Sequence, residues 1–275
     1  MKKIFIPVVL GVMMAFSSCE MLEDSTKSLS DADIIDGLKT ALNVGADSAS
    51  GNLAKLNGYY KNPLLKIPLP AEAEAVRNLI NSNSSLATLS STIGLDDKFE
   101  EVIIAVNRAA ESAASEAAPI FKGAITNLTI ADGWEILHGT VPTATKSASF
   151  DSTAATQYLK NQTYDDLTAL YAPKINLALG KDLIGTTSAT EAWASLTSTY
   201  NTFLNNSAVK LAVALGGIDL PASINTDLGE FSTQKALDGL FYKVGAEEKK
   251  IRKNPLQWAS SLVGDILEKV FGSVQ

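Results

Sequence analysis

Few residues in this sequence are of the types that carry acid–base chemistry at neutral pH. His138 is the only histidine, and as a general base it would need an acid such as Asp132 or Glu135 beside it. No nucleophile motif of the G-x-S-x-G type accompanies it. We therefore interpret His138 as a helix-terminal residue before Gly139 that interacts with the last backbone carbonyl groups. One histidine and one cysteine do not make a zinc site, so we expect no metal and no cofactor.

Polar residues on one alanine-rich stretch form a first candidate binding site. Arg108 and Glu111 are three residues apart and share a face of the predicted helix, with Asn107 beside them. If alanines bury this pair, desolvation makes it either a structural clamp or the polar floor of a pocket. We favour the clamp and keep the pocket as the alternative.

A second candidate group lies near the C-terminus. Glu247 with Lys250, and Glu248 with Arg252, are spaced as favourable ion pairs along one helix, and we expect them on its solvated side. A binding site made of Glu247, Glu248 and Arg252 is the alternative to this solvated face. Two carboxylates act as acid and base only at a suitable separation, and sequence spacing does not establish that separation.

Helices must position all these residues. The stretch from Phe231 to Phe271 predicts two amphipathic helices that meet at Asn254-Pro255, with Ser232 as the first N-cap. At the other end of the chain, Ser30 followed by Asp31 and Asp33 is typical of a helix start. The sequence thus predicts an all-α fold, a multi-helix bundle, over residues 31–275.

Two further features shape this expected bundle. Tyr59–Pro70 contains three prolines, which exclude a regular helix and favour an extended segment packed across the helices. Thr129–Asp132 resembles a capping box that opens a short helix. Residues 154–160 and 164–179 are expected as separate helical pieces around a Thr163 cap, and the inward stripe of the second piece includes Leu170.

Composition limits the classes of function. The 275 residues carry a formal charge of -7. Nucleic-acid binding needs a basic stripe that displaces counterions, and we see no long basic face. We therefore expect no nucleic acid among the partners.

The N-terminus predicts export and lipidation. Lys2 and Lys3 precede an apolar run from Ile4 to Phe16 that is too short to span a bilayer, so residues 1–18 are interpreted as a signal peptide. The ending Ser17-Ser18-Cys19 resembles the bacterial lipobox, in which the cysteine is acylated. Acyl chains would then anchor the protein to a membrane. Residues 19–30 are polar and are predicted to form a flexible tether. Acidic residues after Cys19 are similar to surface-export signals of some Bacteroidetes lipoproteins.

Several motifs together resemble the bacterial DUF4197 family. They are Tyr60-Lys61-Asn62-Pro63 with Lys66–Pro70, Asn107–Glu111 with Ala118–Phe121, Ala154–Leu159, and Thr233–Phe241 with Glu247-Glu248, Ile251-Arg252 and Asn254-Pro255. This resemblance covers roughly Asp31 to Gly272. It implies an exported, all-helical bacterial domain of uncharacterised role, and it supplies no catalytic residues to carry over.

These observations favour a non-enzymatic binding or interaction module of the cell envelope. We expect an outer-membrane lipoprotein, periplasmic or surface-facing, that meets a protein partner or an apolar small molecule. An exposed apolar patch would favour the protein partner, and a closed cavity the small molecule. The alternative is a hydrolase that uses Glu111, Glu116 or nearby acids on an envelope polymer.

Overall fold

The structure of the chain is a computed structural model that describes residues 29–142, 150–258 and 263–274. Within these ranges the chain forms helices and no β-strand, which confirms the predicted all-α multi-helix bundle. The helices are α1 (Asp31–Leu53), α2 (Ala71–Asn81), α3 (Ser84–Ile93), α4 (Leu95–Ala114), α5 (Ala117–Asn127), α6 (Gly133–Leu137), α7 (Ala154–Leu179), α8 (Ala189–Asn205), α9 (Ser207–Gly216), α10 (Leu228–Lys253), the 3-10 helix η1 (Pro255–Trp258), α11 (Gly264–Phe271) and the 3-10 helix η2 (Gly272–Val274). The predicted signal peptide, Cys19 and most of the predicted tether lie outside the described residues.

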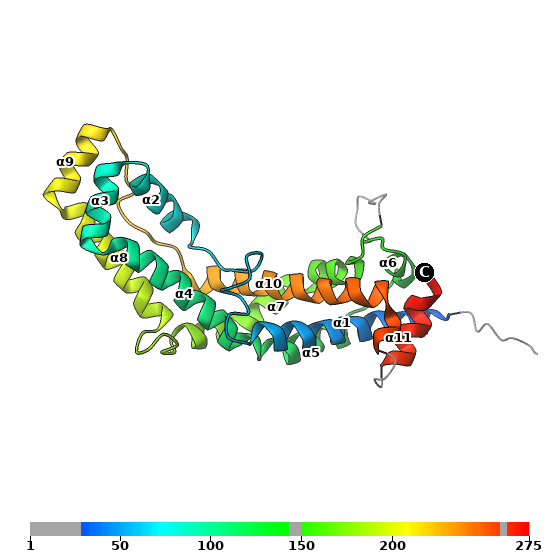
Figure 1. Ribbon diagram of the computed structural model, residues 1–275. Helices are drawn as coiled ribbons and strands as arrows, with labels where there is room; N and C mark the ends of the chain where they lie inside the picture. Colours follow the sequence, from blue (N-terminus) through cyan, green and yellow to red (C-terminus); the bar gives the residue numbers. More distant parts are fainter. Residues whose placement is uncertain (1–28, 143–149, 259–262, 275) are drawn as a thin grey trace, which may run out of the picture.

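The bundle is elongated (Figure 1). Helices α1, α5, α7 and α10 run along one part of it, and α10 packs against both α1 and α7. Helix α11 closes one end against α1, whereas α3, α8 and α9 gather at the opposite end. Helix α4 joins the two parts because it packs against both α7 and α8. The candidate residues therefore lie on α4, which joins the two parts, and near the C-terminal end of α10, beside α11.

Helix α1 begins as the sequence predicts. The Ser30 hydroxyl accepts a hydrogen bond from the Asp33 N–H, and the Asp33 carboxylate accepts one from the Ser30 N–H, which completes a capping box. Gly37 on this helix faces α11 so closely that an added Cβ atom would lie 2.6 Å from Val270 Cγ2. A side chain at this position would push the two helices apart.

Helix α10 begins earlier than predicted. Asp227, and not Ser232, is the N-cap, because its side chain accepts a hydrogen bond from the Glu230 N–H. Ser232 is buried inside the helix. The predicted end is confirmed, since α10 stops at Lys253 before Pro255 and a second helix follows.

Two other local predictions are wrong. Residues 154–179 form the single helix α7, and the Thr163 hydroxyl donates to the Leu159 carbonyl within it instead of capping a second helix. Thr129 forms no capping box; Asp132 is the N-cap of α6 without a side-chain hydrogen bond, and the Thr129 carbonyl accepts from the Tyr158 hydroxyl.

The proline-rich segment lies across the bundle, as predicted. Tyr59, Ile67 and Leu69 are buried in the hydrophobic core, although the segment has no regular structure after Leu65. An irregular buried backbone needs partners for its N–H and C=O groups. Those partners come from the polar residues of α4.

Candidate functional site

Asn107 binds the proline-rich segment directly. Its Oδ1 accepts a hydrogen bond from the Ile67 N–H at 2.9 Å, and its Nδ2 donates to the Ile67 carbonyl at 2.8 Å. Nδ2 also donates to the Ile103 carbonyl at 2.7 Å, and the side chain is fully buried. The Asn107 amide thus makes with Ile67 the two hydrogen bonds that a neighbouring β-strand would otherwise make with one residue of an extended chain.

Glu111 and Arg108 hold the start of the same segment. Glu111 Oε1 accepts hydrogen bonds from the N–H groups of Tyr59 and Tyr60, both at 3.1 Å, and Oε2 pairs with Arg108 Nη1 at 2.5 Å. Arg108 Nη2 donates to Asn57 Oδ1 at 2.9 Å, and Asn57 has a positive φ of 69°. In the structure the Arg108–Glu111 pair therefore acts as a clamp on a tight turn, with each charge matched by several partners.

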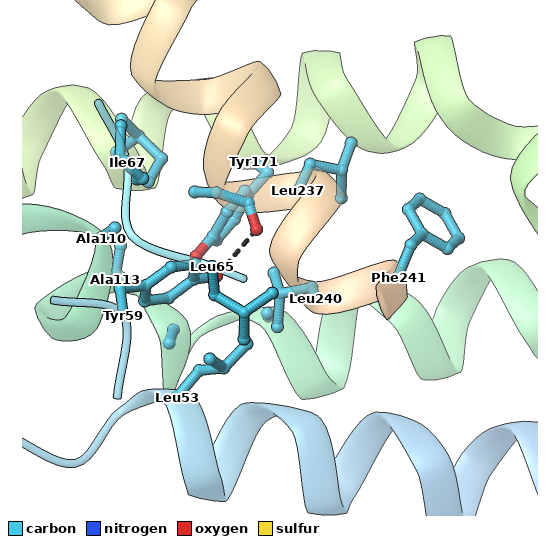
Figure 2. Packing of buried hydrophobic residues seen from close by; sticks show 14 of the residues in the cluster. Leu53, Tyr59, Leu65, Ile67, Ala110, Ala113, Tyr171, Leu237, Leu240 and Phe241 are labelled. Atoms are coloured by element: carbon cyan, nitrogen blue, oxygen red, sulfur yellow. Dashed lines mark hydrogen bonds between the residues drawn. The ribbon is translucent and has the colours of Figure 1, made fainter. Parts of the chain in front are cut away.

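Tyr59 fastens this segment to α10 (Figure 2). Its hydroxyl donates to the Ala236 carbonyl at 2.7 Å, and Tyr171 of α7 lies beside it. Burial raises the pKa of the Tyr59 phenol well above its ordinary value, and the nearby Tyr171 and Glu111 add to this rise. The phenol therefore stays neutral and serves as a hydrogen-bond donor.

The expectation that Glu248 and Arg252 lie on a solvated face is wrong. Glu248 is fully buried, and its carboxylate accepts hydrogen bonds from the Ala155 N–H at 3.0 Å and the Thr156 N–H at 2.8 Å. These are free N–H groups of the first turn of α7, where a negative charge is favourable. The pair is buried because the ends of α6 and α7 pack over this side of α10.

Arg252 completes this contact, which we call the Glu248–Arg252 clamp. Its Nε donates to Glu248 Oε1 at 2.8 Å, while Nη1 and Nη2 donate to the carbonyls of Leu137 and Ile136 at 2.6 and 2.9 Å. The clamp thus joins the C-terminal end of α6 to the N-terminal end of α7. Arg252 also lies over the Phe271 ring, 5.3 Å from its centroid, and so contacts α11.

Glu247 forms the predicted ion pair, but it does not lie on a solvated face. Its carboxylate pairs with Lys250 at 2.6 Å; the lysine side chain is 59% exposed, whereas that of Glu247 is 12% exposed. The structure therefore separates the six candidate residues. Asn107, Arg108 and Glu111 form one contact on α4, Glu248 and Arg252 form a second on α10, and Glu247 pairs with the exposed Lys250.

The residues considered for catalysis are not assembled into a reactive centre. His138 is the C-cap of α6, and its Nδ1 lies 2.8 Å from the Trp134 carbonyl, in agreement with its interpretation as a helix-terminal residue. Glu111, the best acid for a hydrolase, is engaged by Arg108, whereas Glu116 is exposed and lies 3.1 Å from Lys174. In the described ranges no group of three or more histidine, cysteine or acidic residues is placed to hold a metal ion.

The sequence did not point to an open groove that lies between α5 and α7. This α5–α7 groove has a volume of about 710 Å³. It is lined by Pro119, Ile120, Gly123, Ala124, Asn127, Leu128, Thr129, Gln162, Thr163, Asp166, Leu167 and Leu170. Leu170, expected in the core, is 58% exposed, and Leu177 one heptad further is 68% exposed. The signal in the sequence was that α7 carries more apolar residues than one face can bury.

Fold and contacts together define an all-helical domain in which buried charged residues fasten helix ends and an extended segment. None of the described helices is long and apolar enough to span a bilayer. The chain matches the family model described as "Protein of unknown function (DUF4197)" over residues 28–272, and it belongs to this family. No curated protein and no solved structure matches the chain.

Proposed function

We propose that this domain is a non-enzymatic interaction module of the bacterial cell envelope, in which the α5–α7 groove receives an apolar helix face of a protein partner. The observation that carries this proposal is the groove itself, with Leu170 exposed along its wall. Soluble proteins rarely expose apolar side chains in a contiguous patch unless the patch has a partner.

The shape and lining of the groove favour a protein over a small molecule. Its walls are the helices α5 and α7, and Leu177, seven residues beyond Leu170, extends the exposed apolar side of α7 past the groove. An amphipathic helix meets such a surface with residues at steps of three, four and seven. Polar Asn127, Gln162 and Asp166 lie among the apolar lining residues and would bond the polar edge of the partner helix.

Location at the envelope is part of the same proposal. The basic start, short apolar run and Ser17-Ser18-Cys19 ending support export and acylation of Cys19. The domain would then be tethered to the outer membrane through residues 19–30, facing the periplasm or the cell surface. Replacing Cys19 with serine should move the protein from the membrane fraction to the soluble fraction, and unchanged partition would contradict the anchor.

Site-specific photocrosslinking in the intact envelope tests the groove. A photoreactive residue at position 170 should give a discrete protein adduct, whereas the same residue at exposed position 56 should not. Leu56 is 74% exposed and lies on a turn that does not line the groove, so it is a matched control. An added Leu177→Glu substitution should reduce the adduct.

Two outcomes would contradict the docking model. Equal adducts from positions 170 and 56 would indicate unspecific contact. A reproducible extra mass in native mass spectrometry, lost on unfolding and blocked by bulky substitution of Gly123, would instead assign the groove to a small apolar ligand.

A further inference from the structure

A second surface, formed by α7, α10 and the proline-rich segment, combines several lysines with an exposed tyrosine. Two adjoining cavities of about 440 and 330 Å³ share Asp238 and Tyr242 as lining residues, and we call them together the lysine groove. Its four cations come from the proline-rich segment, α7 and α10; they are Lys66, Lys160, Lys235 and Lys249. None of these residues lines the α5–α7 groove.

The charge of this surface is opposite to that of the molecule. The chain has a formal charge of -7, yet Asp238 is the one acidic residue among the described residues that line the two cavities. Asp238 is already matched, because Lys160 Nζ lies 2.8 Å from its Oδ1 and the Tyr164 hydroxyl donates to the same oxygen at 3.3 Å. The residues that line the two cavities thus carry a net positive charge.

Two of these lysines are free to bind an anion. Lys66 lies 3.9 Å from Glu100 and 4.7 Å from the Tyr60 ring centroid. In contrast, Lys235 and Lys249 are exposed and form no ion pair with any residue that the structure describes. The helix dipole explains cations in the last turn of α10, but Lys235 lies in its N-terminal third, where a cation gains nothing from the dipole.

The spacing of these groups defines the length of the ligand. Lys235, Tyr242 and Lys249 follow one another at seven-residue steps and so share one side of α10. At a rise of 1.5 Å per residue the two lysines are about 21 Å apart along the helix, with Tyr242 midway. A small anion would reach only one lysine, so the full set suits an elongated molecule with repeated negative charges.

We propose that the lysine groove binds an acidic polysaccharide. The Tyr242 side chain is 50% exposed, so its ring offers an apolar face to a sugar ring and its hydroxyl a hydrogen-bond partner. Exposed Gln157 and half-buried Thr153 add neutral hydrogen-bonding groups between the cations. An extended acidic peptide would pair with the same lysines, but it would leave the exposed Tyr242 ring without the flat apolar partner that a sugar ring provides.

Direct binding measurements on the full soluble domain test this assignment. Polygalacturonate oligomers serve as the acidic probe, dextran as the neutral probe and poly-L-glutamate as the peptide polyanion. We expect polygalacturonate to bind, with an affinity that falls as salt rises because the lysines are exposed. The double variant Lys235→Gln/Lys249→Gln should lose at least about tenfold in affinity.

Matched variants distinguish binding at the lysine groove from attraction that depends only on the overall charge of the protein. Lys181→Gln/Lys210→Gln removes the same charge from exposed positions outside the groove and should change affinity by less than about twofold. Tyr242→Ala should weaken binding severalfold, and Tyr242→Phe should retain most of the affinity because the ring is kept. Circular dichroism of each variant checks that the fold is retained.

Three results would overturn the proposal. If polygalacturonate does not bind, the lysine groove is not a site for acidic polysaccharides. Equal losses in the two double-lysine variants would make the attraction a property of overall charge. Poly-L-glutamate binding as tightly, with the same dependence on Lys235 and Lys249, would assign the groove to an acidic protein segment instead.

Discussion

Buried carboxylates in this protein are bound by backbone N–H groups as well as by arginine. Glu111 and Glu248 each accept from two N–H groups of a segment distant in sequence, and each also pairs with an arginine on its own helix. An ionised carboxylate loses several kcal/mol on leaving water unless such partners replace the water. These acids therefore fix the backbone around them, and losing the charge should disturb the segments that they hold.

The Glu248–Arg252 clamp gives a direct test at the residue scale. Glu248→Gln should lower the free energy of unfolding by about 3–5 kcal/mol, because Arg252 would remain buried without its counter-charge. The neighbouring Glu247→Gln should lower it by less, about 1 kcal/mol, since its partner Lys250 is exposed and stays hydrated when the pair is lost. Urea denaturation followed by circular dichroism measures both. Similar losses in the two variants would show that the clamp is not the stabilising contact.

At the scale of elements, the proline-rich segment depends on α4 for hydrogen bonds that a helix or strand would make internally. Asn107→Ala should leave the Ile67 N–H and C=O without protein partners, at a cost of about 1–3 kcal/mol for each group. Hydrogen exchange should speed up at the Ile67 amide more than at amides in the middle of α1. Asn201→Ala, at an exposed position of α8, is the control. If Ile67 stays as protected as before, another group must hold the segment.

Close approach of α10 to the same segment requires a glycine. A Cβ atom at Gly239 would lie 2.6 Å from Cε1 of the buried Tyr59 ring. Gly239→Ala should therefore destabilise the protein by about 1–3 kcal/mol, as overpacking does. Gly51→Ala has no atom within 4 Å of the new Cβ on α1 and should stabilise by about 0.5–1 kcal/mol through helix propensity. Thermal unfolding of both variants should show shifts of opposite sign, and a shared sign would contradict this packing.

At the scale of the whole molecule, α11 closes one end of the elongated bundle (Figure 1). Its buried residues Leu267, Val270 and Phe271 pack on α1 and on Arg252. Burial of each such side chain contributes about 1.5–3 kcal/mol, and the sum is comparable with the whole stability of a domain.

Deletion of residues 254–275 should therefore abolish cooperative unfolding. The control is a chain ending at Phe271, which keeps α11 and should unfold with nearly the same midpoint. Urea titration of the two chains is the measurement. A cooperative transition at an unchanged midpoint in the shorter chain would show that the rest of the bundle folds independently of α11.

The sequence by itself determined the all-α class, most of the helices, the extended proline-rich segment and the family. Caps such as Ser30, breakers such as Pro255 and apolar periodicity act over a few residues, so these features can be deduced without the fold. Local reasoning also found the ion pairs Arg108–Glu111 and Glu248–Arg252, since their spacing alone brings the side chains together on a helix.

Only the tertiary structure decided which of these pairs is buried and which apolar residues are left exposed. Glu248 and Arg252 bind groups some 92 to 116 residues away in the chain, so their burial depends on where α6 and α7 pack. Leu170 belongs to a helical stripe by spacing, yet no neighbouring helix covers it fully and it borders the α5–α7 groove. Lys235, Tyr242 and Lys249 share one side of α10 by spacing, but their groove exists because the proline-rich segment and α7 lie beside that helix. Periodicity defines the faces of a helix, whereas packing between distant segments determines which face meets solvent.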